Sequence, residues 1–274
     1  MALRVNQNVS ALTAHRWMTV NDAALAKSIE HLSSGYRVNT ASDDPAGLVI
    51  SEKLRAQVGG LGQALSNTQH AINMIKTAEG ALGEVSALLR SMRDLAVHAA
   101  NTGVNGPAEV GADQAQITSA LETLDRIGQN TQFGSKILLD GTASGLIFQI
   151  GSEAGQTVTI SITAVSASDL GVSGLDVTTA TGAQAAIAAI DAAIDTVSTT
   201  RVNLGAFQKN TLESNLNSLA IAKENLAASE STIRDADMAA EMVQFTRNQI
   251  LLQSSSAMLL QANQAPQIIL QLLR

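Results

Sequence analysis

Apolar residues recur at every seventh position at both ends of the chain. The repeat near the C-terminus consists of Met238, Phe245, Leu252 and Leu259, with Met242 beside it. The repeat near the N-terminus consists of Ala11, Met18, Leu25 and Leu32, with Ile29 between the last two. This spacing is typical of a helix that packs lengthwise on another helix. Because a single helix of this kind is marginal in water, the two ends are predicted to pair. The alternative is two unrelated amphipathic helices.

The last residues are unusually apolar for a chain end. After Pro266 the large apolar residues are Ile268, Ile269, Leu270, Leu272 and Leu273. Such an end usually needs another surface to cover it. We therefore expect an assembly surface that has no fixed structure until a neighbouring molecule covers it.

A second long helix is predicted after a turn-rich stretch that ends at Pro45. The apolar seven-residue spacing runs from Pro45 to about Asn101. One unbroken helix of this length would measure about 85 Å at ~1.5 Å per residue. A globule of this chain length has a diameter of roughly 50 Å. The three glycines between 59 and 62 are where the helix would break; we favour an unbroken helix in a rod.

The middle of the chain predicts shorter elements. A helix carrying Ile117 and Leu124 follows Pro107, and residues 128–145 are expected to form an extended loop. Apolar and polar residues then alternate in two runs within residues 146–163, which predicts a β-hairpin closed by residues 151–156.

The composition changes after the predicted hairpin. Residues 164–182 are rich in Ser, Thr, Gly and Ala, so we expect a short variable surface segment with little core content. Helical spacing then returns, runs to Leu204, and resumes at Leu212.

These patterns together predict a mainly α fold. We expect an elongated rod of long antiparallel coiled-coil helices with a small β-hairpin insert, in which the N- and C-terminal helices are paired. Residues 1–42 and 235–274 are expected to form a terminal coiled-coil domain. Residues 43–234 are expected to form a helical rod domain that carries the hairpin.

Composition and charge narrow the class of protein. Hydrophobic residues make up 45 % of the chain but aromatic residues only 2 %, which suits a narrow core of Leu, Ile, Val and Ala. The net charge of −7 and the absence of a basic run argue against a nucleic acid or an anionic membrane as partner. No run of about 18 apolar residues exists for membrane insertion. The N-terminal sequence lacks the apolar core of a cleaved signal peptide.

Candidate chemistry is sparse. The chain has no cysteine, its four histidines are scattered without metal-ligand spacing, and no nucleotide-binding or nucleophile motif occurs. The pair Asp43 and Asp44 precedes a helix, so we interpret it as a helix cap and a loop contact. We expect no catalytic residue, no cofactor and no metal, hence a structural protein rather than an enzyme. An interface between copies that does not close on itself would generate a filament.

Several long runs resemble one family. The run LSSGYRVNTASDDPAGLVISEKLRAQ, residues 32–57, resembles the signature of bacterial flagellins. Similar runs are Met92–Asn101, Leu124–Gly141, Phe148–Thr157, Leu204–Leu219 and Ser229–Gln264. The resemblance covers about the first 160 and the last 75 residues.

This resemblance implies a structural subunit that polymerises into the flagellar filament for swimming motility. The terminal helices would form the inner core, and the short middle implies a minimal form without outer domains. Export through the flagellar type III apparatus without a cleaved signal peptide, and an extracellular location, follow from the family. So do a secretion chaperone on the C-terminal segment and the filament cap and hook-associated proteins as partners. The alternative is a hook-filament junction protein, which shares the end sequences.

The family also implies contact with the innate immune receptor for flagellin. Arg93 and Leu95 match the recognised pattern, whereas an arginine of that pattern is displaced to Arg90 and Ser91 stands in its place. Gln116 occupies the position of a common glutamate. These departures argue against strong receptor activation.

Overall fold

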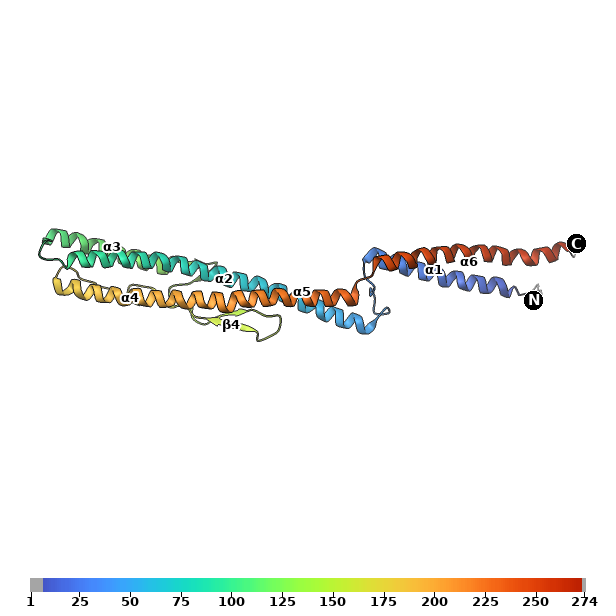
Figure 1. Cartoon of the computed structure of the whole chain (residues 1–274), viewed down its shortest axis with the longest axis horizontal. Coiled ribbons are helices and arrows are strands. Elements are labelled where there is room, and N and C mark those ends of the chain that lie inside the picture. The colour runs from blue at the N-terminus through green and yellow to red at the C-terminus, as the bar shows by residue number, and fades with distance from the viewer. Residues whose placement is uncertain (1–6, 273–274) are drawn as a thin grey trace. The chain divides into compact units, whose positions relative to one another are not determined.

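The computed structural model describes residues 7–272, with side chains to residue 264. The helices are α1 (Val9–Ser34), α2 (Pro45–Ala99), α3 (Pro107–Asn130), α4 (Ala180–Ala206), α5 (Ser214–Arg234) and α6 (Met238–Leu272) (Figure 1). A π-helical segment, η1 (Phe207–Glu213), joins α4 to α5. The strands are β1 (Gln132–Phe133), β2 (Lys136–Ile137), β3 (Leu146–Gln149) and β4 (Thr157–Ile160). The predicted fold class, long helices with a small hairpin, is confirmed.

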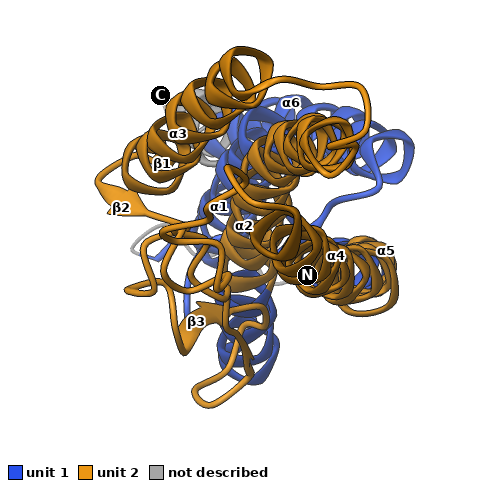
Figure 2. Cartoon of the chain, turned by 90° about the vertical axis from the view of Figure 1, so that its left-hand side faces the viewer, with its two compact units in different colours: residues 1–57, 225–274 blue, residues 58–224 orange. Residues whose placement is uncertain are grey.

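The chain divides into two compact units (Figure 2). Unit 1 comprises residues 1–57 and 225–274, and unit 2 comprises residues 58–224. The divisions fall inside α2 and α5, whereas the sequence placed domain boundaries in the loops after residues 42 and 234. Helices that continue through a boundary leave no composition change for a sequence pattern to detect.

Unit 1 is built around the two terminal helices. Asn8 caps α1 by accepting the N–H of Ala11 at 3.1 Å, and Gly35 ends it with a φ of 75°, a left-handed conformation that glycine adopts readily. The helices α1 and α6 pack against each other. Side chains of residues 8, 21 and 28 bond to residues 262, 255 and 248 respectively, so the pair is antiparallel. The predicted pairing of the chain ends is confirmed.

The helix α6 does not stop at its proline. It continues through Pro266 to Leu272, so the backbone up to Leu272 is not the unstructured tail that the sequence suggested. The apolar side chains after Pro266 lie outside the described residues.

The core of unit 2 comes from α2, α3 and the α4–η1–α5 stretch. Its fully buried large side chains include Ile75, Leu82, Leu89, Met92, Ile117, Leu124, Ile190, Leu204 and Leu212. The seven-residue spacing of α2 places its own members of this set, Ile75, Leu82, Leu89 and Met92, on one stripe. The helix is unbroken at Gly59, Gly60 and Gly62, which confirms the prediction of a single long helix.

The π-helical segment explains a step in the apolar spacing. The buried residues Val197 and Leu204 are seven apart, as are Leu212 and Leu219, but Leu204 and Leu212 are eight apart. In an α-helix one extra residue would rotate the second stripe by about 100°. A π-helix bonds residue i to i+5 and therefore accommodates more residues per turn. The segment η1 absorbs the extra residue.

The predicted hairpin is present and is held against helices of its own unit. The strands β3 and β4 are antiparallel, with Leu146 opposite Ile160. The amides of Asn67 and Asn215 donate to the carbonyl oxygens of Gln149 and Ile150 at 3.1 and 3.0 Å. A second, smaller hairpin of β1 and β2 lies in the stretch expected to be an extended loop; strands of two residues are too short to show a periodicity.

The prediction for residues 164–182 was wrong. Five apolar residues of this segment are buried: Val165, Ala167, Leu170, Val172 and Val177. The carboxylate of Asp125 accepts the N–H of Ala167 at 2.7 Å, and Gln114 both donates to the carbonyl oxygen of Leu175 and accepts the N–H of Val177. Helix α3 therefore satisfies the backbone of an irregular segment, which lets isolated apolar residues enter the core without a repeating pattern.

Candidate assembly surface

The predicted seam residues fall into two groups. Seven lie half-buried between the helices: Ala11, Met18, Leu25, Leu32, Phe245, Leu252 and Leu259. Three remain exposed by about half: Ile29, Met238 and Met242. Ile29 and Met242 each lie four residues after a seam position, on the flank of their helix. Met238 is the first residue of α6, at a level where α1 has already ended at Gly35.

Polar side chains alternate with these apolar residues along the contact. The amide of Asn21 donates to the hydroxyl of Ser255 at 2.9 Å, and the amide of Asn248 donates to the hydroxyl of Ser28 at 3.2 Å. Sequence reasoning missed these residues. The signal was available: a small or polar residue stands three positions after each apolar seam residue, at Ala14, Asn21 and Ser28 on α1.

The outer faces of both helices carry exposed apolar side chains. Five are on α1: Val9, Leu12, Trp17, Val20 and Ile29. On α6, among the residues up to 264 whose side chains the structure describes, seven are exposed: Met238, Met242, Val243, Ile250, Leu251, Met258 and Leu260. An exposed apolar surface of this extent, which we call the terminal apolar face, usually marks an interaction site.

The terminal apolar face is grooved. One groove of about 490 Å³ lies between the helices, where Trp17 of α1 faces Leu251 and Met258 of α6. A second, of about 500 Å³, lies along α6 and includes Met242 and Ile250. Open depressions lined by apolar side chains of a helix suit a helix of another molecule better than a small ligand.

The two connections that link the terminal helices to α2 and α5 are bonded to each other. Tyr36 and Asp235 form an antiparallel bridge, and the N–H of Arg37 donates to the carbonyl oxygen of Arg234 at 2.7 Å. The guanidinium of Arg234 lies 4.8 Å from the centre of the Tyr36 ring and 2.6 Å from the carboxylate of Glu52. This cluster, the connector cluster, fixes where the terminal pair begins.

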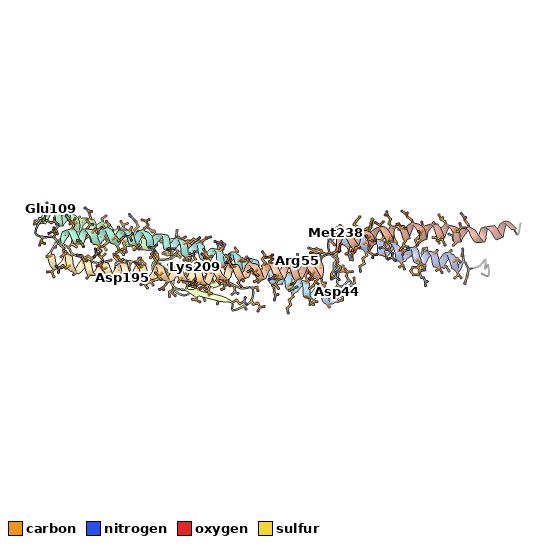
Figure 3. All side chains as sticks on the ribbon, viewed as in Figure 1. Asp44, Arg55, Glu109, Asp195, Lys209 and Met238 are labelled. Carbon is orange, nitrogen blue, oxygen red and sulfur yellow. The ribbon has the colours of Figure 1, made fainter. Side chains whose placement is uncertain are left out.

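The two adjacent carboxylates have separate structural roles. Asp44 accepts the N–H of Gly47 at 2.8 Å and caps α2 (Figure 3). Asp43 pairs with Lys27 at 2.9 Å. The hydrogen bond from Lys27, with the backbone N–H of Thr40, holds the pKa of Asp43 well below its usual range. The interpretation of the pair as a cap and a loop contact is confirmed.

The residues predicted for receptor contact lie on α2 in unit 2. Arg90 is exposed, whereas Leu95 is half-buried and packs against the core. The guanidinium of Arg93 is bonded to the carboxylate of Asp191 at 2.6 Å. Arg90 is therefore the freer of the two arginines.

Residues 7–272 contain no group of three or more acidic, His or Cys side chains placed to hold a metal ion. Within the same residues, no helix has the length and apolar character needed to span a membrane.

The comparisons with known proteins agree over nearly the whole chain. Residues 5–144 match the family described as the bacterial flagellin N-terminal helical region, and residues 187–273 match its C-terminal helical region. A flagellin of Halalkalibacterium halodurans is 47 % identical over 98 % of this chain and 99 % of its own length. A flagellin of Bacillus subtilis is 44 % identical over 99 % of this chain and 100 % of its own length.

Solved structures show the same fold. The crystal structure of a Bacillus cereus flagellin matches with a TM-score of 0.50 and 30 % identity, covering 56 % of this chain and 88 % of that one. A putative flagellar hook-associated protein from Vibrio parahaemolyticus matches with a TM-score of 0.61 over 70 % of this chain and 100 % of its own, but at 16 % identity it shows a shared fold alone. On the family matches and the full-length relatives, the chain belongs to the bacterial flagellins.

Proposed function

We propose that this flagellin, a structural subunit of the flagellar filament, polymerises through the terminal apolar face of α1 and α6, which forms the inner core of the filament. The observation that carries the proposal is the exposure of that face. Trp17, Met258 and Leu260 are 54, 63 and 67 % exposed on a helix pair whose own contact is only partly apolar.

The size of the face indicates how many neighbours it needs. Full burial of one large apolar side chain contributes about 1.5–3 kcal/mol, so covering the exposed half of each residue yields on the order of 10 kcal/mol in total. Association costs roughly 4–15 kcal/mol in lost freedom of motion. Covering part of the face with one neighbour therefore contributes little net free energy, whereas covering it with several neighbours together stabilises the subunit. This favours a polymer over a dimer.

The arrangement of the face also favours an open assembly. The groove between α1 and α6 and the groove along α6 are different surfaces. An interface between different surfaces of identical subunits continues indefinitely unless its rotation closes a ring. A helical filament gives each subunit several neighbours and continues without closing on itself.

Seeded polymerisation of purified subunits tests the proposal. A chain that lacks residues 238–274 is expected not to polymerise, and Trp17→Ser and Met258→Ser are expected to raise the critical concentration. Val202→Ser is the matched control, because Val202 is 68 % exposed on α4 of unit 2. Normal filaments from the truncated chain would refute the proposal, as would an equal effect of the control substitution.

The remaining partners of the proposal follow from the same exposed surface. A subunit with this face uncovered needs protection before assembly, which supports a secretion chaperone on the C-terminal segment. Filament cap and hook-associated proteins would meet the same face at the two filament ends, outside the cell, after export by the flagellar type III apparatus. The proposed role is structural, without catalysis.

Contact with the innate immune receptor is proposed to be weak. Arg90 and Leu95 would supply it, and Arg93 is already paired with Asp191. A receptor would have to replace that ion pair rather than meet a free guanidinium. A reporter-cell assay against a strongly recognised flagellin measures the difference.

A further inference from the structure

The contact between α1 and α6 contains two mixed polar layers of the same composition. Each layer has one asparagine and one serine, and the asparagine is on α1 in one layer (Asn21–Ser255) and on α6 in the other (Ser28–Asn248). Ser28 is only 5 % exposed. Seven residues separate the layers on each helix, so both bonds belong to one register.

One apolar layer lies between the two polar layers, and one lies beyond each of them. By the register of the two bonds, Leu25 stands level with Leu252, Met18 with Leu259, and Leu32 with Phe245. All six side chains are half-buried. Apolar side chains of similar size would fit almost as well after a shift of seven residues, so the apolar layers alone do not select one register.

We infer that Asn21, Ser28, Asn248 and Ser255 determine the longitudinal register of α1 against α6, an inference that rests on the proposed function of these helices in assembly. A buried polar residue in a helix–helix seam selects the register that satisfies it, at some cost in stability. Here one half-buried asparagine from each helix, one of them bonded to the buried Ser28, is satisfied by the same register.

The slipped registers leave the asparagines without these partners. A shift of one heptad in one direction places Asn21 opposite Asn248 and Ser28 opposite Glu241, which can bond to each other, but it places Ser255 opposite Ala14, whose side chain has no polar group. A shift in the other direction places Asn21 opposite Ala262, which has no side-chain acceptor. Leaving one polar group unsatisfied disfavours a state by about tenfold.

The register matters because it sets the terminal apolar face. A shift of seven residues moves one helix along the other by about 10 Å. Trp17 would then leave Leu251 and Met258, and the groove that they form would be lost. Subunits in different registers would present different surfaces and would not join one regular lattice.

Disulfide trapping in assembled filaments reads the register directly, because the chain has no cysteine of its own. Leu259→Cys is combined in turn with Met18→Cys, which reports the observed register, and with Ala11→Cys or Leu25→Cys, which report the two slipped ones. In the otherwise wild-type chain the Met18→Cys combination is expected to cross-link at least about tenfold more than either other.

Two backgrounds test the role of the polar layers. With Asn21, Ser28, Asn248 and Ser255 all changed to alanine, the preference is expected to fall to roughly threefold or less, since apolar layers alone distinguish registers weakly. The matched control exchanges the partners within each layer: N21S with S255N, and S28N with N248S. It keeps one asparagine and one serine per layer and is expected to retain the tenfold preference.

Filament formation is measured first, by sedimentation, so that the two hypotheses fail separately. Wild-type subunits that do not polymerise overturn the proposed function. Filaments of the alanine background that keep the full preference overturn the register inference alone, as does an exchanged control that loses it. If the alanine background does not assemble, N21A with S255A, which removes one layer, is used and should lower the preference by a smaller factor.

Discussion

The π-helical segment between α4 and α5 can be removed by deleting one residue. Its cause is the eight-residue step from Leu204 to Leu212, and deleting Lys209 restores a step of seven. Lys209 is exposed (Figure 3). We expect the deletion to convert η1 to α-helix while both leucines remain buried.

The same deletion elsewhere in the helix should be costly. Asp195 of α4 is also exposed and charged (Figure 3), but deleting it rotates the following stripe by about 100°. Val197 and Leu204, 1 and 2 % exposed, would leave the core before η1 could compensate. At about 1.5–3 kcal/mol for each side chain, the cost is about 3–6 kcal/mol. The variant that lacks Lys209 should have a free energy of unfolding within about 1 kcal/mol of the wild type, because the core is unchanged.

Urea unfolding of the monomer measures the difference. Far-UV circular dichroism follows the helices, while the fluorescence of Trp17, the single tryptophan, reports unit 1 separately. Lys209→Ala controls for the lost charge and should lie within about 0.5 kcal/mol of wild type. If deleting Lys209 destabilises the protein as much as deleting Asp195, the extra residue is not the cause of the π-helix.

Three further predictions concern local contacts. Gly59→Ala should raise the free energy of unfolding by about 0.5–1 kcal/mol, because glycine is unfavourable in a helix and nothing lies within 4 Å of the new Cβ. Gly60→Ala should raise it by less, since its Cβ would lie 3.0 Å from the hairpin residue Ser152. Equal gains in melting experiments would contradict this. Asp43→Asn should flatten the acid side of the stability profile of unit 1. Because the pKa of Asp43 is lower in the folded than in the unfolded protein, its carboxylate stabilises the fold at every pH above the unfolded-state pKa of about 4, and this stabilisation is lost as the pH falls toward the folded-state pKa. Identical acid profiles of the wild type and Asp43→Asn by Trp17 fluorescence would show that the pair with Lys27 is not formed. Arg234→Ala should cost about 1–2 kcal/mol through loss of the contacts with Tyr36 and Glu52, while Arg55→Ala, whose own distance to Glu52 is 3.8 Å, should cost little in the same urea assay.

Periodicity predicted the elements that are long enough to repeat. The helices α1, α2 and α6 and the β3–β4 hairpin each carry several turns or alternations of apolar residues, and all are present. The elements that it missed are short or irregular. The β1–β2 hairpin has two residues in each strand, and the buried residues of 164–182 enter the core singly. Their burial depends on Gln114 and Asp125 of α3, which are distant in sequence.

For the candidate assembly surface too, the repeating part was predicted from the sequence and the rest was not. The sequence indicated that α1 and α6 pair and which residues form the apolar part of their contact, because a repeat of seven fixes one side of a helix. It did not show that Ile29, Met238 and Met242 lie outside that contact, since this depends on where the partner helix ends and on its width. The register of the pair, the asparagine–serine layers and the groove beside Trp17 were decided only by the tertiary structure. A helix carries the same side chains in every register, and only its packing against a second helix determines which of them meet.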